Sequence, residues 1–363
     1  MINFEDFQTK IQKAIDVRDS RLEVLEGKKH KPLAIFGYGN KGKQISKQLR
    51  LAKQAVQIYD VNPNALESAC SDGFDVVNQI DDLIDFQVIL GSGQNQIEQK
   101  DMVFDNHIFY EEATFLYDLV HLQSRKREMS NCIVHDLDRL YWVYTVLQED
   151  SKSQFLDILL FRASLNPLHL QNSRMNNKWM WFDVPLKFKS RDYKNFLDVG
   201  AFDGDTIKAA RSFFPLDRVH AVEANLEFVN RIAQQAKDFK NGLVIYPYAA
   251  WSSDCMLSFV EDHNGMFSVV QEKSGSVCAA KLDSIINENV DLIKLDIEGS
   301  EAEALSGCTK LLSSAPDVLI AAYHRPSDLV DIVSTLLAQN PKYKVYFRHY
   351  SDVYDDSILY FIS

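Results

Sequence analysis

Two stretches of the chain alternate short apolar segments with amphipathic ones, and this alternation constrains the fold more than any other feature. In the longer stretch the apolar segments are FLDVG, RVHAVEA, LVIYPYAA, LIKLDIEG and DVLIAAYH, between residues 196 and 324. Parallel strands need crossover helices, so the alternation predicts an α/β fold with a parallel sheet covered by helices. The last two apolar segments, KVYFRHY and SILYFI, lie too close together for a crossover helix and predict an antiparallel hairpin.

A shorter stretch with the same plan comes first in the chain. PLAIFGYG, AVQIYDVNP and FQVILGSG predict three strands between residues 31 and 105. Residues 1–30 predict an amphipathic helix, with apolar residues at helical spacing: Phe4, Phe7, Ile11, Ala14 and Ile15. We expect a small Rossmann-like domain with this helix (1–105), a helical connector that joins the two domains or forms a dimer face (106–175), and a larger Rossmann-like domain (176–363).

Charge and cysteine content exclude several classes of protein. The net charge of −12 and the isoelectric point near 5.2 argue against non-specific binding to nucleic acid, which needs a basic face. The five cysteines are scattered without metal-ligand spacing, as expected for reduced thiols in a cytoplasm. The first residues lack the pattern of a signal peptide, and no apolar run approaches the ~18 residues of a membrane span. We therefore expect a cytoplasmic protein without a membrane span or a nucleic-acid partner, and a homodimer is compatible with these data.

The turn LDVGAFDGDT follows the first strand of the larger domain. In an open parallel sheet, ligands bind beyond the carboxyl ends of the strands, and a glycine such as Gly200 permits a sharp turn and close approach of a ligand. The turn carries the acids Asp198, Asp203 and Asp205. They would repel a diphosphate and suit a cation, such as the amino group of a sulfonium-bearing methionine.

Glu223 closes the second strand of this domain, in RVHAVEA. An acid at this position accepts hydrogen bonds from a ribose diol. Both S-adenosylmethionine and NAD carry that diol, so Glu223 alone does not distinguish them. The acidic turn, Glu223 and the terminal hairpin together favour S-adenosylmethionine.

Several motifs between residues 195 and 363 resemble the FkbM-type methyltransferases, which are class I enzymes that use S-adenosylmethionine. They are FLDVGAFDGDT, VHAVEAN, KLDSIINENVDLIKLDIEGSE, YHRPSDL and FRHYSD. The resemblance implies a seven-stranded sheet with an antiparallel last strand, and methylation of a hydroxyl of a sugar, glycoconjugate or related metabolite. It also implies a set of cofactor residues: Asp198, Gly200, Ala201, Asp203, Gly204 and Thr206 for the methionine moiety, Glu223 for the ribose, and Asn225 and Ala249 near the adenine.

Methylation of a hydroxyl requires a group that takes its proton. Asp296, after the fourth strand, is the expected base, and His324, after the fifth, is the second candidate. Other polar residues at the same edge are expected to bind the acceptor: Glu298, Arg325, Arg348 and His349. Asp262 joins Asp296 and Glu298 as a candidate magnesium ligand, but the spacing is not that of a metal motif, so no metal is assigned.

The upstream turn FGYGNKGKQI matches the dinucleotide fingerprint in outline, with Gly37, Gly39 and Gly42 as its glycines and Asp60 after the next strand. Three hypotheses remain for it: a structural or dimerising role, a site for a nucleotide or nucleotide sugar, and NAD-dependent redox chemistry. The alternative to a methyltransferase is therefore a dinucleotide-binding or nucleotide-sugar-binding protein, or an NAD-dependent oxidoreductase.

Overall fold

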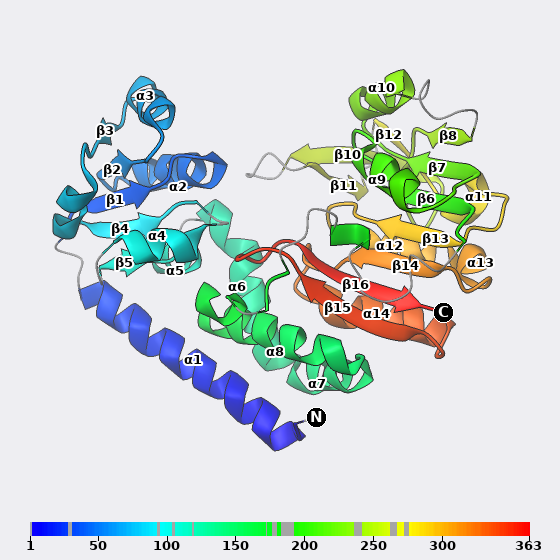
Figure 1. The fold of residues 1–363 in the computed structure, drawn as a ribbon, viewed down its shortest axis with the longest axis horizontal. Coiled ribbons are helices and arrows are strands. Elements are labelled where there is room, and N and C mark those ends of the chain that lie inside the picture. The colour runs from blue at the N-terminus through cyan, green and yellow to red at the C-terminus, as the bar shows by residue number, and fades with distance from the viewer. Residues whose placement is uncertain are drawn as a thin grey trace. The chain divides into compact units, whose positions relative to one another are not determined.

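The computed structural model describes residues 2–27, 31–92, 95–103, 106–117, 120–171, 173–175, 180–182, 192–235, 242–261, 267–271 and 276–363. The chain forms two compact units (Figure 1). Unit 1 comprises Met1–Tyr144, Ser153–Arg174 and Ser351–Asp355, and unit 2 comprises Thr145–Lys152, Met175–Tyr350 and Asp356–Ser363. Within the described residues, no helix combines the length and the apolar character needed to cross a membrane.

Unit 1 contains a five-stranded parallel sheet in the order β3-β2-β1-β4-β5, drawn in blue and cyan in Figure 1. Its strands are β1 (Leu33–Phe36), β2 (Val56–Tyr59), β3 (Asp75–Val76), β4 (Gln87–Leu90) and β5 (His107–Ile108). The three predicted strands are confirmed as β1, β2 and β4. β3 and β5 were not predicted, because a strand of only two residues gives no periodic pattern in the sequence.

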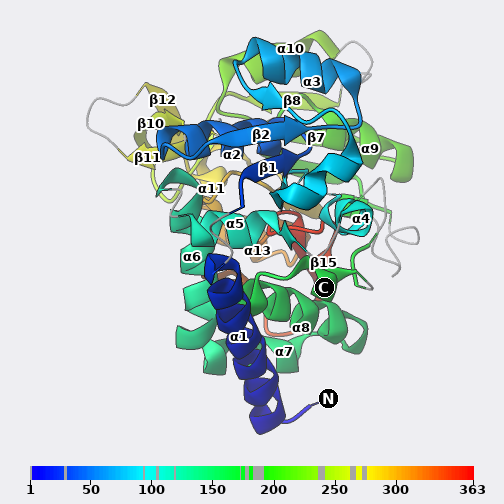
Figure 2. The ribbon, with the colours of Figure 1, turned by 90° about the vertical axis from the view of Figure 1, so that its left-hand side faces the viewer.

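The helices of unit 1 include the predicted N-terminal helix, which is confirmed as α1 (Phe4–Gly27) and is seen in dark blue in Figure 2. Four of its five predicted apolar residues are buried. The ring of Phe7 lies 5.3 Å from that of Tyr141 and 5.5 Å from that of Tyr144. The other helices are α2 (Asn40–Leu51), α3 (Pro63–Ser71), α4 (Gln96–Met102), α5 (Tyr110–Leu116), α6 (Val120–His135), and most of α7 (Leu137–Val146) and α8 (Glu149–Ser164).

The boundaries of the two compact units differ from those of the three parts expected from the sequence. The sheet of unit 1 extends beyond residue 105, because β5 pairs with β4. Most of the helical segment 106–175 clusters with this sheet and does not form a unit of its own. The division into 1–105, 106–175 and 176–363 stays a prediction about domains.

Unit 2 is built on a seven-stranded sheet in the order β15-β16-β14-β13-β6-β7-β8 (Figure 1). The strands are β6 (Asn195–Val199), β7 (Arg218–Val222), β8 (Leu243–Tyr246), β13 (Leu292–Leu295), β14 (Asp317–Ala321), β15 (Lys344–His349) and β16 (Ser357–Ile362). All are parallel except β16, which runs antiparallel to both β14 and β15. The predicted Rossmann-like sheet with an antiparallel last strand and a terminal hairpin is confirmed.

Short helices connect these strands. They are α9 (Asp205–Phe213), α10 (Leu226–Gln235), α11 (Leu282–Ile285), α12 (Glu301–Ser306), α13 (Thr309–Leu312) and α14 (Asp328–Gln339). The central strands are almost entirely buried and apolar, as parallel strands covered on both faces must be. The charged residues Asp198 in β6 and Lys294 in β13 lie inside this core and are register partners, and a third buried acid, Asp317, begins β14.

A second, four-stranded sheet in unit 2 was not predicted. It has the order β11-β10-β12-β9, with β9 (Ala249–Ala250), β10 (Cys255–Glu261), β11 (Phe267–Gln271) and β12 (Val277–Ala280). Leu257 and Val277 pack with Trp251 in a small apolar cluster. The sheet places Ala249 beside Ala279, at the point where the chain leaves β8.

Candidate active site

The turn after β6 brings the carboxyl ends of two neighbouring strands together. Gly200 has φ +78°, and a Cβ atom there would lie 1.8 Å from the carbonyl oxygen of Asp296. Any side chain at this position would therefore push apart the ends of β6 and β13. Gly204, with φ +85°, caps the start of α9. Gly200 was expected to let a ligand approach. In the structure it is needed because the end of β13 lies so close to it.

A buried ion pair lies directly below this turn. The Nζ atom of Lys294 is 3.2 Å from Oδ1 of Asp198 and donates a hydrogen bond of 2.6 Å to the carbonyl oxygen of Gly200. Burial lowers the pKa of Lys294, but the carboxylates of Asp198 and Asp296 outweigh it and raise that pKa. Burial also raises the pKa of Asp198 to about 6, although Lys294 opposes this shift. Because Asp198 is fully buried in this pair, it supports the turn from beneath.

Glu223, after β7, ties the turn to the next strand. Its Oε2 accepts a hydrogen bond of 2.9 Å from the backbone N–H of Phe202, and its Oε1 accepts one of 2.8 Å from that of Asn225. Burial raises the pKa of Glu223, against the opposite effect of these backbone N–H groups. Each carboxylate oxygen has two acceptor sites, so Glu223 retains capacity to accept from a diol.

A cavity of about 490 Å³ opens at this edge of the sheet, a size typical of small-molecule sites. Its lining combines apolar and aromatic groups with a few charged ones: Met180, Trp181, Val199, Gly200, Phe202, Asp205, Thr206, Val222, Glu223, Ala224, Asn225, Phe228, Tyr248, Ala249, Ala250, Lys294, Asp296, Ile297, Glu298 and Ser300. The rings of Phe202 and Phe228 lie 4.2 Å apart. The arrangement suits a flat, partly apolar ligand that also carries hydroxyl groups and a positive charge.

Of the cofactor residues expected from the resemblance, five line the cavity and four do not. Those at the cavity are Gly200, Thr206, Glu223, Asn225 and Ala249. Those outside its lining are Asp198, Ala201, Asp203 and Gly204. Five further residues at the cavity were not predicted: Lys294, Phe202, Phe228, Tyr248 and Trp181. The sequence could have indicated Lys294, because a charged residue in the middle of the apolar strand LIKL must have a partner of opposite charge in the interior.

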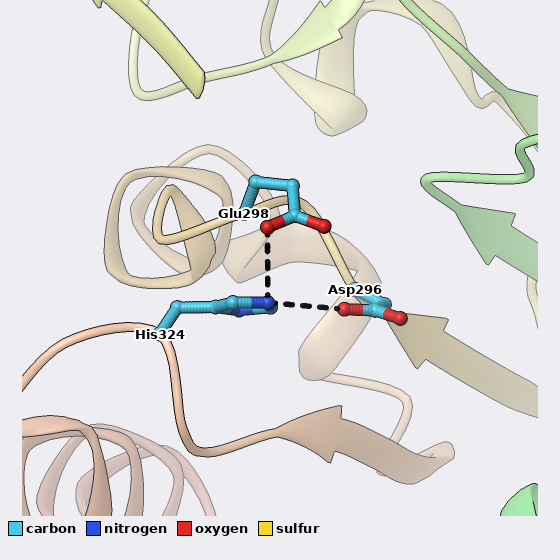
Figure 3. Close-up of side chains that lie close together, drawn as sticks. All are labelled: Asp296, Glu298 and His324. Atoms are coloured by element: carbon cyan, nitrogen blue, oxygen red, sulfur yellow. Dashed lines mark ion pairs between the residues drawn. The ribbon is translucent and has the colours of Figure 1, made fainter. Parts of the chain in front are cut away.

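The turn after β13 carries the expected base Asp296 and the expected acceptor-binding residue Glu298, and it meets His324 at the end of β14 (Figure 3). The Nε2 atom of His324 lies 3.5 Å from Oδ1 of Asp296 and 3.4 Å from Oε2 of Glu298. Its Nδ1 atom lies 2.7 Å from Oε1 of the buried Glu301. Burial lowers the pKa of His324, but Glu301, together with the two other carboxylates, outweighs it and raises that pKa to about 9.

The two expected catalytic residues differ in their access to the cavity. Asp296 and Glu298 line it, whereas His324 is not among its lining residues and is almost fully buried. Glu301 also accepts a hydrogen bond of 3.1 Å from the backbone N–H of Ile297, which fixes the turn. The turn is strained at Glu298, whose φ of +56° is uncommon for a residue with a side chain.

Three of the four expected acceptor residues have other partners. Arg348 is buried and donates to Oδ2 of Asp150 at 2.7 Å, at the start of α8. His349 is buried, with Nδ1 2.9 Å from Oγ of Ser357 across the hairpin. Arg325 donates to Glu303 at 3.1 Å. None of these three residues lines the cavity, so their positions do not support the expected contact with an acceptor. Glu298 is the one expected acceptor residue that does line it. Asp262 lies outside the described residues.

The upstream turn in unit 1 has the same construction as the turn after β6. Gly37 has φ +103°, and a Cβ atom on Gly42 would lie 1.9 Å from the carbonyl oxygen of Gly37. Asp60 accepts hydrogen bonds from the backbone N–H of Tyr38 at 2.6 Å and of Asn62 at 2.8 Å. Gly39 has open space around it. Gly37 and Gly42 therefore serve packing, while Gly39 has no such need.

Comparison with known proteins agrees with this arrangement. Residues 198–345 match the family model of the methyltransferase FkbM domain. The methyltransferase FkbM from Methylobacillus flagellatus KT is 18% identical, with a TM-score of 0.74 over 99% of this chain and 100% of its own. The two chains thus have similar folds over their whole length. No curated protein matches the sequence at a significant level.

Two further solved structures resemble part of the chain. Aeropyrum pernix fibrillarin, with natively bound S-adenosyl-L-methionine, is 13% identical, covers 49% of this chain and 70% of its own, and has a TM-score of 0.33. A precorrin-6y C5,15-methyltransferase from Geobacter metallireducens GS-15 is 15% identical, covers 48% of this chain and 82% of its own, and has a TM-score of 0.31. Both similarities are much weaker than the first.

Proposed function

We propose that this chain, whose residues 198–345 form a methyltransferase FkbM domain, transfers the methyl group of S-adenosylmethionine to a hydroxyl of a sugar, glycoconjugate or related metabolite. The observation that carries the proposal is the position of Glu223. Its carboxylate closes β7, lines the cavity and lies beside the glycine turn, where an acid binds a ribose diol. Asp205 supplies negative charge in the same cavity for the positively charged methionine moiety.

The rest of the cavity supports the same ligand. Phe202, Phe228 and Tyr248 offer aromatic faces on which an adenine ring can pack. Ala249 and Ala250 leave room for close approach to the backbone after β8. Trp181, which also lines the cavity, offers an apolar ring face to an acceptor.

Methyl transfer breaks the bond between sulfur and the methyl carbon and forms a bond between that carbon and the acceptor oxygen. The hydroxyl proton must leave, and a positioned base contributes about 10²–10⁴-fold to the rate. We propose Asp296 as the group that receives it, because its carboxylate lines the cavity at the end of the central strand β13. Glu298 contacts the acceptor from the same turn. His324 lies behind both carboxylates and positions them.

Titration of the intact protein with S-adenosylmethionine tests this proposal. Glu223→Ala is expected to weaken binding about 10–150-fold, because a charge-assisted hydrogen bond contributes about 1.5–3 kcal/mol. Isothermal calorimetry measures the change, and thermal melting verifies that the variant is folded. Glu227→Ala is the control, since it removes an equal charge from the exposed start of α10.

Two results would contradict the proposal. Unchanged affinity in Glu223→Ala would remove this residue from the site. Failure of the intact protein to bind S-adenosylmethionine, together with binding of NAD in a parallel titration, would favour the oxidoreductase alternative.

We propose further that the upstream turn binds a nucleotide or nucleotide sugar at the start of α2. The open space around Gly39 supports this, because no packing contact explains a glycine there. Gly39→Val should leave the fold intact and abolish any nucleotide-induced rise in melting temperature, with S-adenosylmethionine affinity unchanged. If no nucleotide or nucleotide sugar stabilises the wild-type protein, the turn has a structural or dimerising role. A cytoplasmic location, a homodimer and the absence of a nucleic-acid partner stay predictions.

A further inference from the structure

Three metal-binding side chains meet at the turn after β13, and we infer that Asp296, Glu298 and His324 bind a divalent transition-metal cation. One nitrogen or oxygen atom of each lies within 4.8 Å of the corresponding atoms of the other two. Figure 3 shows one edge of the imidazole facing both carboxylates. The three residues come from the ends of two adjacent parallel strands, β13 and β14. The fold therefore assembles a donor set that the spacing in the sequence does not reveal.

The distances in this cluster fit a shared cation better than direct hydrogen bonds. Nε2 of His324 is 3.5 Å from Oδ1 of Asp296 and 3.4 Å from Oε2 of Glu298. A charge-assisted hydrogen bond between such atoms is about 2.7–2.9 Å long. Two ligand atoms that each bind one cation at about 2.1 Å, at a tetrahedral angle, lie about 3.4 Å apart. The observed separations are thus those of neighbouring ligands around one ion.

The two nitrogen atoms of His324 have different environments, as in many metal-bound histidines. Nδ1 is held by Oε1 of Glu301 at 2.7 Å. When a cation displaces the proton from Nε2, a carboxylate on Nδ1 directs the freed lone pair toward the metal. Nε2 has no hydrogen-bond partner among the described residues, and the same holds for Oδ1 of Asp296. His324 is only 4% exposed, so its imidazole is almost completely withdrawn from bulk solvent. A cation between them would satisfy both atoms.

The cluster is open on one side. The side chains of Asp296 and Glu298 are 24% and 34% exposed and line the cavity, so further ligands can reach a bound ion from there. Glu298 holds a strained backbone conformation, with φ +56°, and such strain gathers at binding sites. One imidazole with two carboxylates favours Mn²⁺ or Zn²⁺ over Mg²⁺ and Ca²⁺, which prefer oxygen ligands alone.

The role of the cation in catalysis rests on the proposed function. A hydroxyl oxygen of the acceptor would bind an open position of the ion, which lowers the pKa of that hydroxyl. Its proton then passes to water, while the oxygen takes the methyl group and S-adenosylhomocysteine leaves. With the ion bound, Asp296 is one of its ligands, and the role of proton acceptor proposed above describes the reaction without the ion.

Titration with Mn²⁺ alone tests the site without any methyl transfer. The full chain, stripped with a chelator and free of S-adenosylmethionine, should bind one Mn²⁺ at this site, and pulsed electron paramagnetic resonance should detect the coupled nitrogen of one imidazole. His324→Gln should remove that nitrogen signal and weaken binding by at least about tenfold. Glu298→Gln, at a partly exposed position, should weaken binding similarly and keeps the test valid if the buried histidine variant does not fold.

Glu227→Gln is the matched control, because Glu227 is an exposed acid outside both the cavity lining and the cluster. It should retain the Mn²⁺ affinity and the nitrogen signal. The inference is overturned if neither Mn²⁺ nor Zn²⁺ binds at millimolar concentration, or if bound Mn²⁺ shows no imidazole nitrogen. A parallel calorimetric titration with S-adenosylmethionine separates this outcome from failure of the proposed function, because each ligand is measured in the absence of the other.

Discussion

Asp296→Asn is expected to retain the affinity for S-adenosylmethionine and to lower turnover about 10²–10⁴-fold. The amide has the size of the carboxylate and occupies the same place after β13, at the wall of the cavity. It cannot accept a proton, and it is a weaker ligand for a cation than a carboxylate. The rate of formation of S-adenosylhomocysteine, measured with an acceptor at saturation, reports the loss, and calorimetry verifies cofactor binding.

His324→Gln is the comparison that assigns the roles. The structure places His324 behind the cavity wall, so its loss should affect turnover through the position of the two carboxylates. Near-normal turnover in Asp296→Asn with an inactive His324→Gln would show that the histidine carries the proton. If a chelator stops the wild-type reaction and Mn²⁺ restores it, the ion activates the hydroxyl and Asp296 is one of its ligands.

The main sheet of unit 2 could be predicted because its strands are mainly apolar segments, and three of them (β6, β7 and β13) are followed directly by glycine or an acid. Where a strand is short or half polar, that signal fails, as for β3, β5 and the small sheet around β10. The ends of parallel strands gather at one edge, so the grouping of Glu223 with the glycine turn was also predictable. To predict that Glu223 lies beside the glycine turn, it is enough to know the order of the strands.

The direction of individual side chains was not predictable, because it depends on strand register. Asp198 and Lys294 are register partners, so their side chains share one face of the sheet and meet in its interior. Arg348 and His349 end β15, as expected, but the hairpin register places His349 opposite Ser357, and Arg348 reaches the start of α8. The sequence shows where a residue lies along its strand. The contacts of its side chain depend on which residue of the adjacent strand lies opposite it, and this the sequence does not show.

The buried pair of Asp198 and Lys294 leads to the largest expected effect on stability. Lys294→Met should lower the free energy of unfolding by about 3–5 kcal/mol, because it leaves the Asp198 carboxylate buried without its cation. The hydrogen bond to the carbonyl oxygen of Gly200 is lost as well, so the turn that lines the cavity should loosen. Equilibrium unfolding in urea, followed by tryptophan fluorescence, measures the change.

The double variant Asp198→Asn/Lys294→Met separates an electrostatic cost from a packing defect. It removes the uncompensated charge and should recover most of the stability lost in the single variant. A packing defect would instead leave the single and the double variant equally unstable.

The dependence on pH provides a second test. In the folded wild type the pKa of Asp198 is raised to about 6, above its value of about 3.9 in an unfolded chain. Without Lys294 this pKa rises further, so the folded state binds a proton more tightly than the unfolded state over a wider range. The destabilisation caused by Lys294→Met should therefore be largest at pH 8 and shrink as the pH falls and Asp198 becomes neutral. A loss of stability that is the same at pH 5 and pH 8 would show that the carboxylate is not the source of the cost.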